Sequence, residues 1–219
     1  MERHEILDLL GDRILQLSVP HPVRVGIDGI DASGKTRLAD ELADWLAPSG
    51  RQIIRASVDG FHHPKAHRFR AGQGPESYYH DSHNHPLMIE SLLAPLGPGG
   101  SRRFRVARFD FRTDSEVDAP VEIADEDGIL LMDGIFLQRP ELFGYWDLRI
   151  FLHTEFETSL QRGLERDTDL FGSGDKTVER YRTRYVPGQE MYLAQVAPAD
   201  RADIVIDNDD WRNPIVVKR

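Results

Sequence analysis

Residues 23–46 read VRVGIDGIDASGKTRLADELADWL, and this stretch decides the fold. Its first residues, 23–27, are rich in β-branched side chains and predict a buried strand. Leu38, Leu42 and Leu46 then recur at the spacing of one helical face. Between the two lies the pattern G-x-x-x-x-G-K-[ST], which requires a strand before it and a helix after it. The motif consists of Gly29, Ile30, Asp31, Ala32, Ser33, Gly34, Lys35 and Thr36.

The residue types of this motif suit a phosphate chain. Gly29 and Gly34 let the backbone approach phosphate where a Cβ would obstruct it. Successive backbone N–H groups and the N-terminus of the following helix cradle the anion. Lys35 reaches the β- and γ-phosphates as a compact positive charge, and the Thr36 hydroxyl can ligate Mg²⁺. The alternative, a glycine-rich turn that only joins strand to helix, is weaker because both flanks are correct.

Composition narrows the class of protein. The chain has 219 residues, 40% of them hydrophobic, and a net charge of −10. This length suits a single domain over residues 1–219. The acidic charge argues against nucleic-acid or anionic-membrane partners, and the lack of cysteine excludes disulfides and thiol catalysis. No apolar run reaches membrane-spanning length and the first 14 residues lack a secretory signal, so we expect a cytoplasmic protein. The sequence is also compatible with a homo-oligomer.

Further apolar runs predict the other strands of the sheet, at 52–58, 128–132, 146–152 and 202–206. Two of these runs end in a carboxylate, Asp59 and Asp133. In open α/β sheets ligands bind outside the carboxyl ends of the strands. An acid placed there can accept a proton from a substrate hydroxyl or hold Mg²⁺. Asp before Gly is also a common turn residue, but the nearby phosphate loop favours the functional interpretation.

Residues 61–86 show no clear period and hold six of the nine histidines. A loop of this length in a compact domain is usually functional or mobile. One interpretation is a metal site, but no spacing matches a known zinc pattern, so a polar loop lining a substrate cleft is favoured. The histidines are His62, His63, His67, His80, His83 and His85.

The remaining segments complete an α/β architecture. Residues 4–17 predict an amphipathic helix that covers the sheet, and residues 87–96 a short helix. Weak alternation over 102–111 and 117–123 predicts a small antiparallel ribbon. The tail at 215–217 either pairs or frays.

Arginines gather near the C-terminal third of this acidic chain. Residues 156–167 and 176–196 predict helices, separated by a polar break at 169–175. The cluster contains Arg162, Arg166, Lys176, Arg180, Arg182 and Arg184. Most charge runs are solvated helix faces. The functional interpretation is a lid, approximately residues 162–188, whose arginines neutralise a transferring phosphoryl group and exclude water.

Taken in order, the motifs resemble those of the uridine kinase / phosphoribulokinase-like family of P-loop kinases. They are GIDASGKT, SVDGF, YYHDSHNH, RFDF, LLMDGIF, LQRGLERD and ADIVI, and the resemblance covers roughly residues 22–208. It implies a three-layer P-loop NTPase fold with a mostly parallel sheet, a small antiparallel ribbon and a helical lid. It also implies ATP and Mg²⁺ as cofactors and a small-molecule acceptor.

The resemblance assigns roles to residues. Asp59 would orient and deprotonate the acceptor hydroxyl, and Lys35 and Arg166 would stabilise the transferred group. Thr36 and Asp133 would hold Mg²⁺. Arg162 and Arg166 would join the phosphate loop in binding the nucleotide. The acceptor-binding residues implied are Asp59, His62, Tyr79, Asp81, Phe109, Phe111, Asp114 and Arg184.

The sequence departs from the uridine kinases on the acceptor side. Asp81 matches an acid that binds ribose hydroxyls, and Phe109 and Phe111 match aromatics that contact the pyrimidine. Asp114, however, stands at or near the place of a histidine used against the base, and His62 stands in place of a tyrosine. The residues that the resemblance assigns to ATP binding are present.

We therefore expect a kinase that phosphorylates the 5′-hydroxyl of uridine or cytidine. A kinase of the same family acting on a sugar, pantothenate or glycerate is the alternative. A regulatory nucleotide switch is less favoured, because the sequence has no guanine-specifying N-K-x-D motif and a switch does not explain the arginine cluster.

Overall fold

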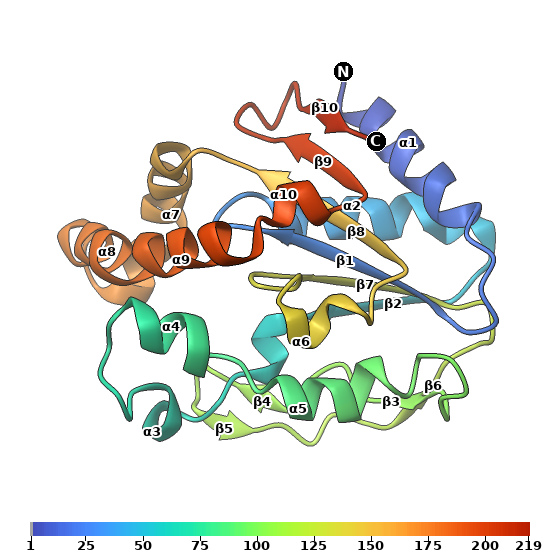
Figure 1. Cartoon of the computed structure of the whole chain (residues 1–219), viewed down its shortest axis with the longest axis horizontal. Coiled ribbons are helices and arrows are strands. Elements are labelled where there is room, and N and C mark those ends of the chain that lie inside the picture. Colours follow the sequence, from blue (N-terminus) through green and yellow to red (C-terminus); the bar gives the residue numbers. More distant parts are fainter. Residues whose placement is uncertain (1) are drawn as a thin grey trace.

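The computed structural model describes residues 2–219 and centres on one six-stranded sheet (Figure 1). The strand order is β10-β9-β8-β1-β7-β2. All neighbours are parallel except β10, which runs antiparallel to β9. The strands are β1 (Val23–Gly29), β2 (Ile53–Ser57), β7 (Ile129–Gly134), β8 (Leu148–His153), β9 (Ile204–Asp207) and β10 (Ile215–Lys218). The predicted mostly parallel sheet is confirmed, and the 215–217 tail pairs.

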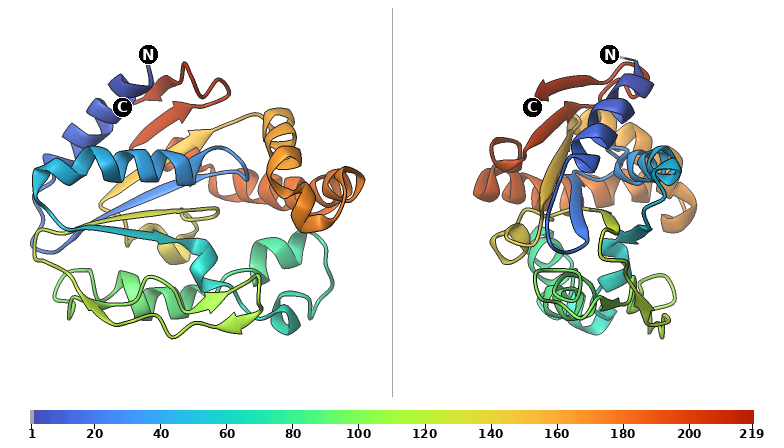
Figure 2. Two further views of the ribbon diagram at one scale, coloured as in Figure 1. Left: turned by 180° about the vertical axis from the view of Figure 1, so that it is seen from behind. Right: turned by 90° about the vertical axis from the view of Figure 1, so that its right-hand side faces the viewer.

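Helices cover both faces of the sheet (Figure 2). On one face α1 (Arg3–Leu15) and α2 (Lys35–Leu46) pack against the apolar side of β1, β7 and β8. On the other lie α6 (Pro140–Phe143), α9 (Val186–Val196) and α10 (Pro198–Arg201). Successive β7 residues alternate between the two layers, because side chains of a strand point to opposite faces. Leu131 joins the α1–α2 core, whereas Met132 joins the other.

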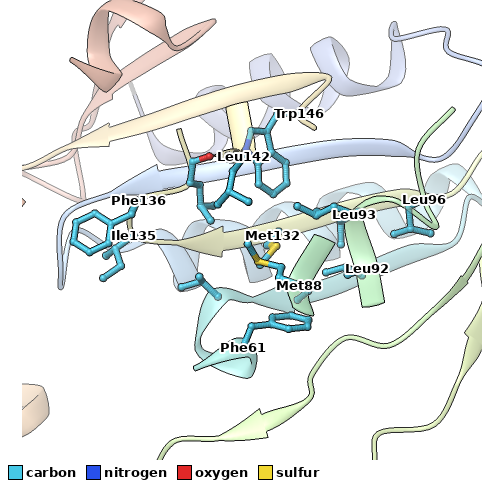
Figure 3. Close-up of a cluster of buried hydrophobic side chains, with 14 of the residues drawn as sticks. Phe61, Met88, Leu92, Leu93, Leu96, Met132, Ile135, Phe136, Leu142 and Trp146 are labelled. Atoms are coloured by element: carbon cyan, nitrogen blue, oxygen red, sulfur yellow. Dashed lines mark hydrogen bonds between the residues drawn. The ribbon is translucent and has the colours of Figure 1, made fainter. Parts of the chain in front are cut away.

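The second core includes a helical segment from the middle of the chain (Figure 3). There α5 (His85–Met88) continues as a π-helical turn over Ile89–Leu93, which confirms the short helix predicted at 87–96. Met88, Leu92 and Leu93 are fully buried beside Met132 and Trp146. Burial of this apolar face anchors the 61–125 region along the β2 edge of the sheet (Figure 1).

The histidine-rich stretch is more regular than its sequence indicated. Residues 61–86 contain α3 (Lys65–Arg68) and α4 (Pro75–Asp81), and His62 and His83 form an isolated antiparallel bridge. The expectation of an irregular loop was wrong. Helices of one or two turns are too short to show a 3.6-residue period, so tertiary contacts define them.

The predicted antiparallel ribbon is present as two short ladders. β3 (Arg103–Phe104) pairs with β6 (Glu122–Ile123), and β4 (Phe109–Asp110) pairs with β5 (Ser115–Glu116). Asp114, at the turn of the second ladder, has a positive φ of 54°. Its left-handed backbone suits a hairpin turn.

The arginine-rich region forms a helical hairpin at the carboxyl ends of the central strands (Figure 1). α7 (Phe156–Phe171) is followed by α8 (Gly174–Arg180), a π-helical turn at Tyr181–Tyr185, and α9. The predicted break at 169–175 was too long, because α7 continues to Phe171. Only two residues separate the helices: Gly172, at a φ of 86°, ends α7, and the Ser173 hydroxyl caps α8. Within residues 2–219 no helix is long and apolar enough to cross a membrane.

Because Leu131 lies in an interior strand with no exposed surface, truncating it leaves a cavity in the core that β7 shares with α1 and α2. We expect Leu131→Ala to lower the free energy of unfolding by roughly 2–5 kcal/mol, the usual cost of a buried leucine cavity. Urea unfolding followed by far-UV circular dichroism measures this. The control is Val217→Ala, since Val217 is 65% exposed. Equal losses in the two variants would contradict the assignment of this core.

Candidate active site

The phosphate loop follows β1 and curls around its own lysine. Gly29 and Gly34 adopt φ angles of 156° and 93°, and a Cβ on Gly29 would lie 2.5 Å from the Leu152 carbonyl oxygen. The Lys35 ammonium is buried and donates to the Ile30 carbonyl and, at 3.3 Å, to the Ser33 hydroxyl. Burial lowers the pKa of Lys35, while nearby carboxylates oppose that shift. The loop therefore holds a positive charge at its centre.

Thr36 and Asp133, the two predicted Mg²⁺ ligands, are in direct contact. The Thr36 hydroxyl donates to Asp133 Oδ2 at 2.7 Å, and Arg55 donates to Asp133 Oδ1 at 2.9 Å. Asp133 lies at the end of β7, opposite Ile27 of β1 in the parallel register, and is 2% exposed. A hydroxyl and a carboxylate beside the loop are the oxygen donors that Mg²⁺ prefers, so these residues fit the ion.

Asp59 lies one strand further along the same edge. β2 pairs with β7, so Asp59, two residues past the end of β2, reaches the cleft beside Asp133. Its side chain is open to solvent, yet the crowded cleft raises the pKa of the carboxyl by desolvation, against the opposing effect of His62. His62 lies within hydrogen-bond distance, its Nδ1 3.1 Å from the Asp59 carbonyl oxygen.

Beyond Asp59 a cavity of about 770 Å³ opens between the 65–73 segment and the helical hairpin. Of the predicted acceptor residues, Phe111 and Arg184 line it. Asp114 lies at its margin, where its carboxylate accepts from Arg68 at 3.2 Å. The ring centroid of Phe111 is 4.9 Å from that of His62, which joins the cavity to the Asp59 end of the cleft.

Other predicted site residues have structural partners. Tyr79 and Phe109 are buried, with 4% and 5% of their surface exposed, and Tyr79 packs edge-on against Phe136. The Asp81 carboxylate accepts from Arg70 at 2.8 Å. The predicted acceptor contacts of these three residues stay predictions.

The two lid arginines also have partners. The Arg162 guanidinium donates to the carbonyl oxygens of Asn208 and Asp209, at 3.0 and 2.8 Å, and so supports the chain after β9. Arg166 donates to its neighbour Asp167 at 2.7 Å. Their predicted contacts with nucleotide stay predictions.

Asp31 was predicted only as a member of the nucleotide-binding phosphate loop, with no role for its side chain, yet it links that loop to three other elements. Its carboxylate accepts from the Tyr78 hydroxyl of α4 at 2.6 Å and from Gln189 Nε2 of α9 at 2.8 Å. Its carbonyl oxygen accepts from Ser159 of α7 at 2.7 Å. These partners lie 47 to 158 residues away, so no local sequence signal marks them. Asp31 therefore couples the loop to the hairpin.

Asp28, also without a predicted role, is buried behind the loop. Its carboxylate accepts from the Gly29 backbone N–H at 2.8 Å and from the Tyr192 hydroxyl. Burial raises the pKa of Asp28 to about 6, even though the hydrogen bonds from Tyr192 and Gly29 favour the ionised form.

A strand, a phosphate loop and a helix, with Asp133 at the end of β7 and Asp59 just beyond β2, define a P-loop phosphotransferase. The family described as "Phosphoribulokinase / Uridine kinase family" matches residues 24–210, and the chain belongs to it. The resemblance inferred from the motifs is thereby confirmed.

Individual relatives are similar over most of the chain. A uridine kinase of Lactobacillus johnsonii is 29% identical over 189 residues, covering 84% of this chain and 86% of that one. The uridine-cytidine kinase B of Dictyostelium discoideum is 25% identical, covering 85% and 74%. A solved structure described as a possible uridine kinase from Bacillus stearothermophilus superposes with a TM-score of 0.74 at 24% identity, covering 94% and 99%. That last likeness establishes the fold.

The raised pKa of Asp28 makes its contribution to stability depend on pH. Above about pH 6 the carboxyl is ionised in both folded and unfolded states, and the folded state bears the desolvation cost. Between about pH 4 and 6 only the folded state keeps the proton, so stability from this group falls as pH rises. The free energy of unfolding of Asp28→Asn, measured relative to wild type, should therefore rise by roughly 2–3 kcal/mol as the pH goes from 4 to 7. Urea unfolding across this range measures it, and a parallel pH dependence in both proteins would contradict the assignment.

Proposed function

We propose that this protein transfers the γ-phosphoryl group of ATP to a hydroxyl of a small metabolite, with the 5′-hydroxyl of uridine or cytidine as the first candidate. One observation carries the proposal: Asp59 is open to the cleft, on the edge of the sheet that also carries the phosphate loop. The named activities of the relatives, uridine and uridine-cytidine kinases, support the choice of acceptor.

The residues of the cleft divide the work of phosphoryl transfer. Asp59 accepts the proton of the acceptor hydroxyl while the hydroxyl oxygen attacks the γ-phosphorus. The bond between the γ-phosphorus and the bridging β-phosphate oxygen breaks, and ADP leaves. Lys35 offsets charge on the β- and γ-phosphates. Thr36 and Asp133 would hold Mg²⁺, which when bound supplies further neutralisation of phosphate charge. Position and charge, rather than a covalent intermediate, account for catalysis.

In this proposal residues 162–188, within the α7–α9 hairpin, form the lid of a single-domain enzyme. Arg166 would have to exchange Asp167 for a phosphate oxygen on closure, and its half-exposed position leaves room for that movement. Binding of ATP to the phosphate loop would affect the hairpin through Asp31, which accepts hydrogen bonds from Gln189 and Ser159. Water is excluded from the transfer when the hairpin closes.

The charge of the acceptor cavity favours a second candidate, an acceptor that carries a carboxylate or phosphate group. The cavity is lined by one acidic residue, Glu179, and by six cationic residues: Lys65, Arg68, Arg112, Lys176, Arg180 and Arg184. Such an excess of positive charge in a chain of net charge −10 suits an anion better than a neutral nucleoside. Both candidates share Asp59 and the phosphate loop.

Asp59→Asn tests the proton acceptor, because the amide keeps the shape and loses the basicity. We expect turnover to fall by about 10²–10⁴-fold, while Mg·ATP affinity by calorimetry changes little. Asp118→Asn is the matched control, since the Asp118 side chain is 96% exposed. Near-normal activity of Asp59→Asn would rule out this role.

A panel of acceptors separates the two candidate functions. ADP release from Mg·ATP is measured with uridine, cytidine, pantothenate, glycerate and sugar phosphates. Stimulation by the nucleosides alone, insensitive to Arg112→Gln, identifies a nucleoside kinase. Stimulation by an anionic acceptor, with KM raised about tenfold or more in Arg112→Gln, identifies the second candidate. ATP binding without stimulation by any acceptor would argue against a kinase.

A further inference from the structure

Two histidines face each other beside Asp59. His62 and His83 lie opposite each other in a short antiparallel bridge, and the backbone hydrogen bonds are made by their neighbours. The His63 N–H donates to the Ser82 carbonyl at 2.9 Å, and the Asn84 N–H donates to the Phe61 carbonyl at 2.7 Å. His62 and His83 therefore form a non-hydrogen-bonded pair, the arrangement that brings opposing side chains closest. Their ring centroids are 4.5 Å apart.

Each ring offers a nitrogen with no protein partner to hold it. A proton on His62 Nδ1 can be donated to the Asp59 carbonyl oxygen, 3.1 Å away, which leaves the lone pair on Nε2 free. Metal-binding histidines commonly have one ring nitrogen fixed in this way by a backbone carbonyl. His83 is 5% exposed, and its Nε2 is buried without any hydrogen-bond partner. A buried nitrogen of this kind requires an explanation.

The geometry points to a third ligand. One carboxylate oxygen of Asp59 and one nitrogen from each ring of His62 and His83 all lie within 4.8 Å of one another. In the described part of the chain this is the single group of three or more such side chains that close together. We propose that Asp59, His62 and His83 bind a Zn²⁺ ion at the acceptor end of the cleft.

The ligand set matches the chemistry of Zn²⁺. Two imidazoles and a carboxylate are a common three-ligand zinc set, with a fourth position left for water or substrate. Bonds of about 2.1 Å in a tetrahedron separate ligand atoms by about 3.4 Å, so modest side-chain rotations close the group. Asp59 is exposed and free to rotate, and the cleft supplies the open position. Mg²⁺ prefers oxygen ligands and would stay with Thr36 and Asp133.

Zinc bound here would inhibit the enzyme. The ion would coordinate the Asp59 carboxylate oxygen that otherwise accepts the hydroxyl proton. It would also occupy the position of the acceptor hydroxyl. Metal binding itself does not depend on the proposed kinase function, whereas this inhibition rests on it.

Calorimetric titration of ZnCl₂ into the untagged, nucleotide-free protein tests the site, and CoCl₂ gives a visible spectrum that reports tetrahedral ligation. We expect one ion per chain in the wild type. His62→Gln and His83→Gln should each lower affinity by about 10-fold or more. His67→Gln is the matched control, because His67 stacks on His63 outside this group, and it should bind as the wild type does. Absence of one-to-one binding, or equal losses in His67→Gln and His62→Gln, would overturn the site.

Folding and catalysis are checked separately. Thermal unfolding shows whether each variant is folded. If His83→Gln does not fold, the zinc affinity of His62→Gln tests the site, because His62 is only half-buried. Mg·ATP turnover at buffered free Zn²⁺ should fall with the same midpoint as the calorimetric affinity and recover with chelator. One-to-one binding without inhibition would support the metal site and would instead remove Asp59 from the proposed catalytic role.

Discussion

The pairing of β7 between β1 and β2 is the constraint on which the active site depends. It places the ends of three strands at one edge, so that Thr36, Asp133 and Asp59 lie side by side although they are distant in sequence. The pairing is held by buried side chains on both faces of β7, with Leu131 in one core and Met132 in the other. The free energy of apolar burial thus positions the polar groups.

Two aspartates, buried Asp28 and half-buried Asp31, extend this framework to the helices around the phosphate loop. Asp28 binds α9 through Tyr192, and Asp31 binds α4, α7 and α9 through Tyr78, Ser159 and Gln189. Because Asp28 precedes the phosphate loop and Asp31 lies within it, their hydrogen bonds connect the loop directly to the hairpin. The bonds from Tyr78, Gln189 and Tyr192 go to carboxylate oxygens, and hydrogen bonds to charged groups are stronger than neutral ones.

The acceptor side is built differently. Its wall comes from short helices, a small ribbon and the hairpin, and its charge is concentrated in arginines and lysines of distant segments. The paired histidines His62 and His83 connect this wall to Asp59. The proposed acceptor and zinc sites therefore lie in the irregular parts of the fold, while the phosphate loop and Asp133 lie at the edge of the sheet.

The sequence by itself determined the parallel sheet, the phosphate loop, the strand-terminal acids and the family, because local spacing and strand–loop–helix order encode them. It did not reveal α3 or α4, since short helices lack a readable period, and it ended α7 too early because the polar run at 169–175 resembles a break. Only the tertiary structure decided that Asp31 binds the hairpin, that Tyr79 packs in the core, and that His62 opposes His83. Those contacts join residues far apart in the chain, and long-range packing, rather than local propensity, brings them together.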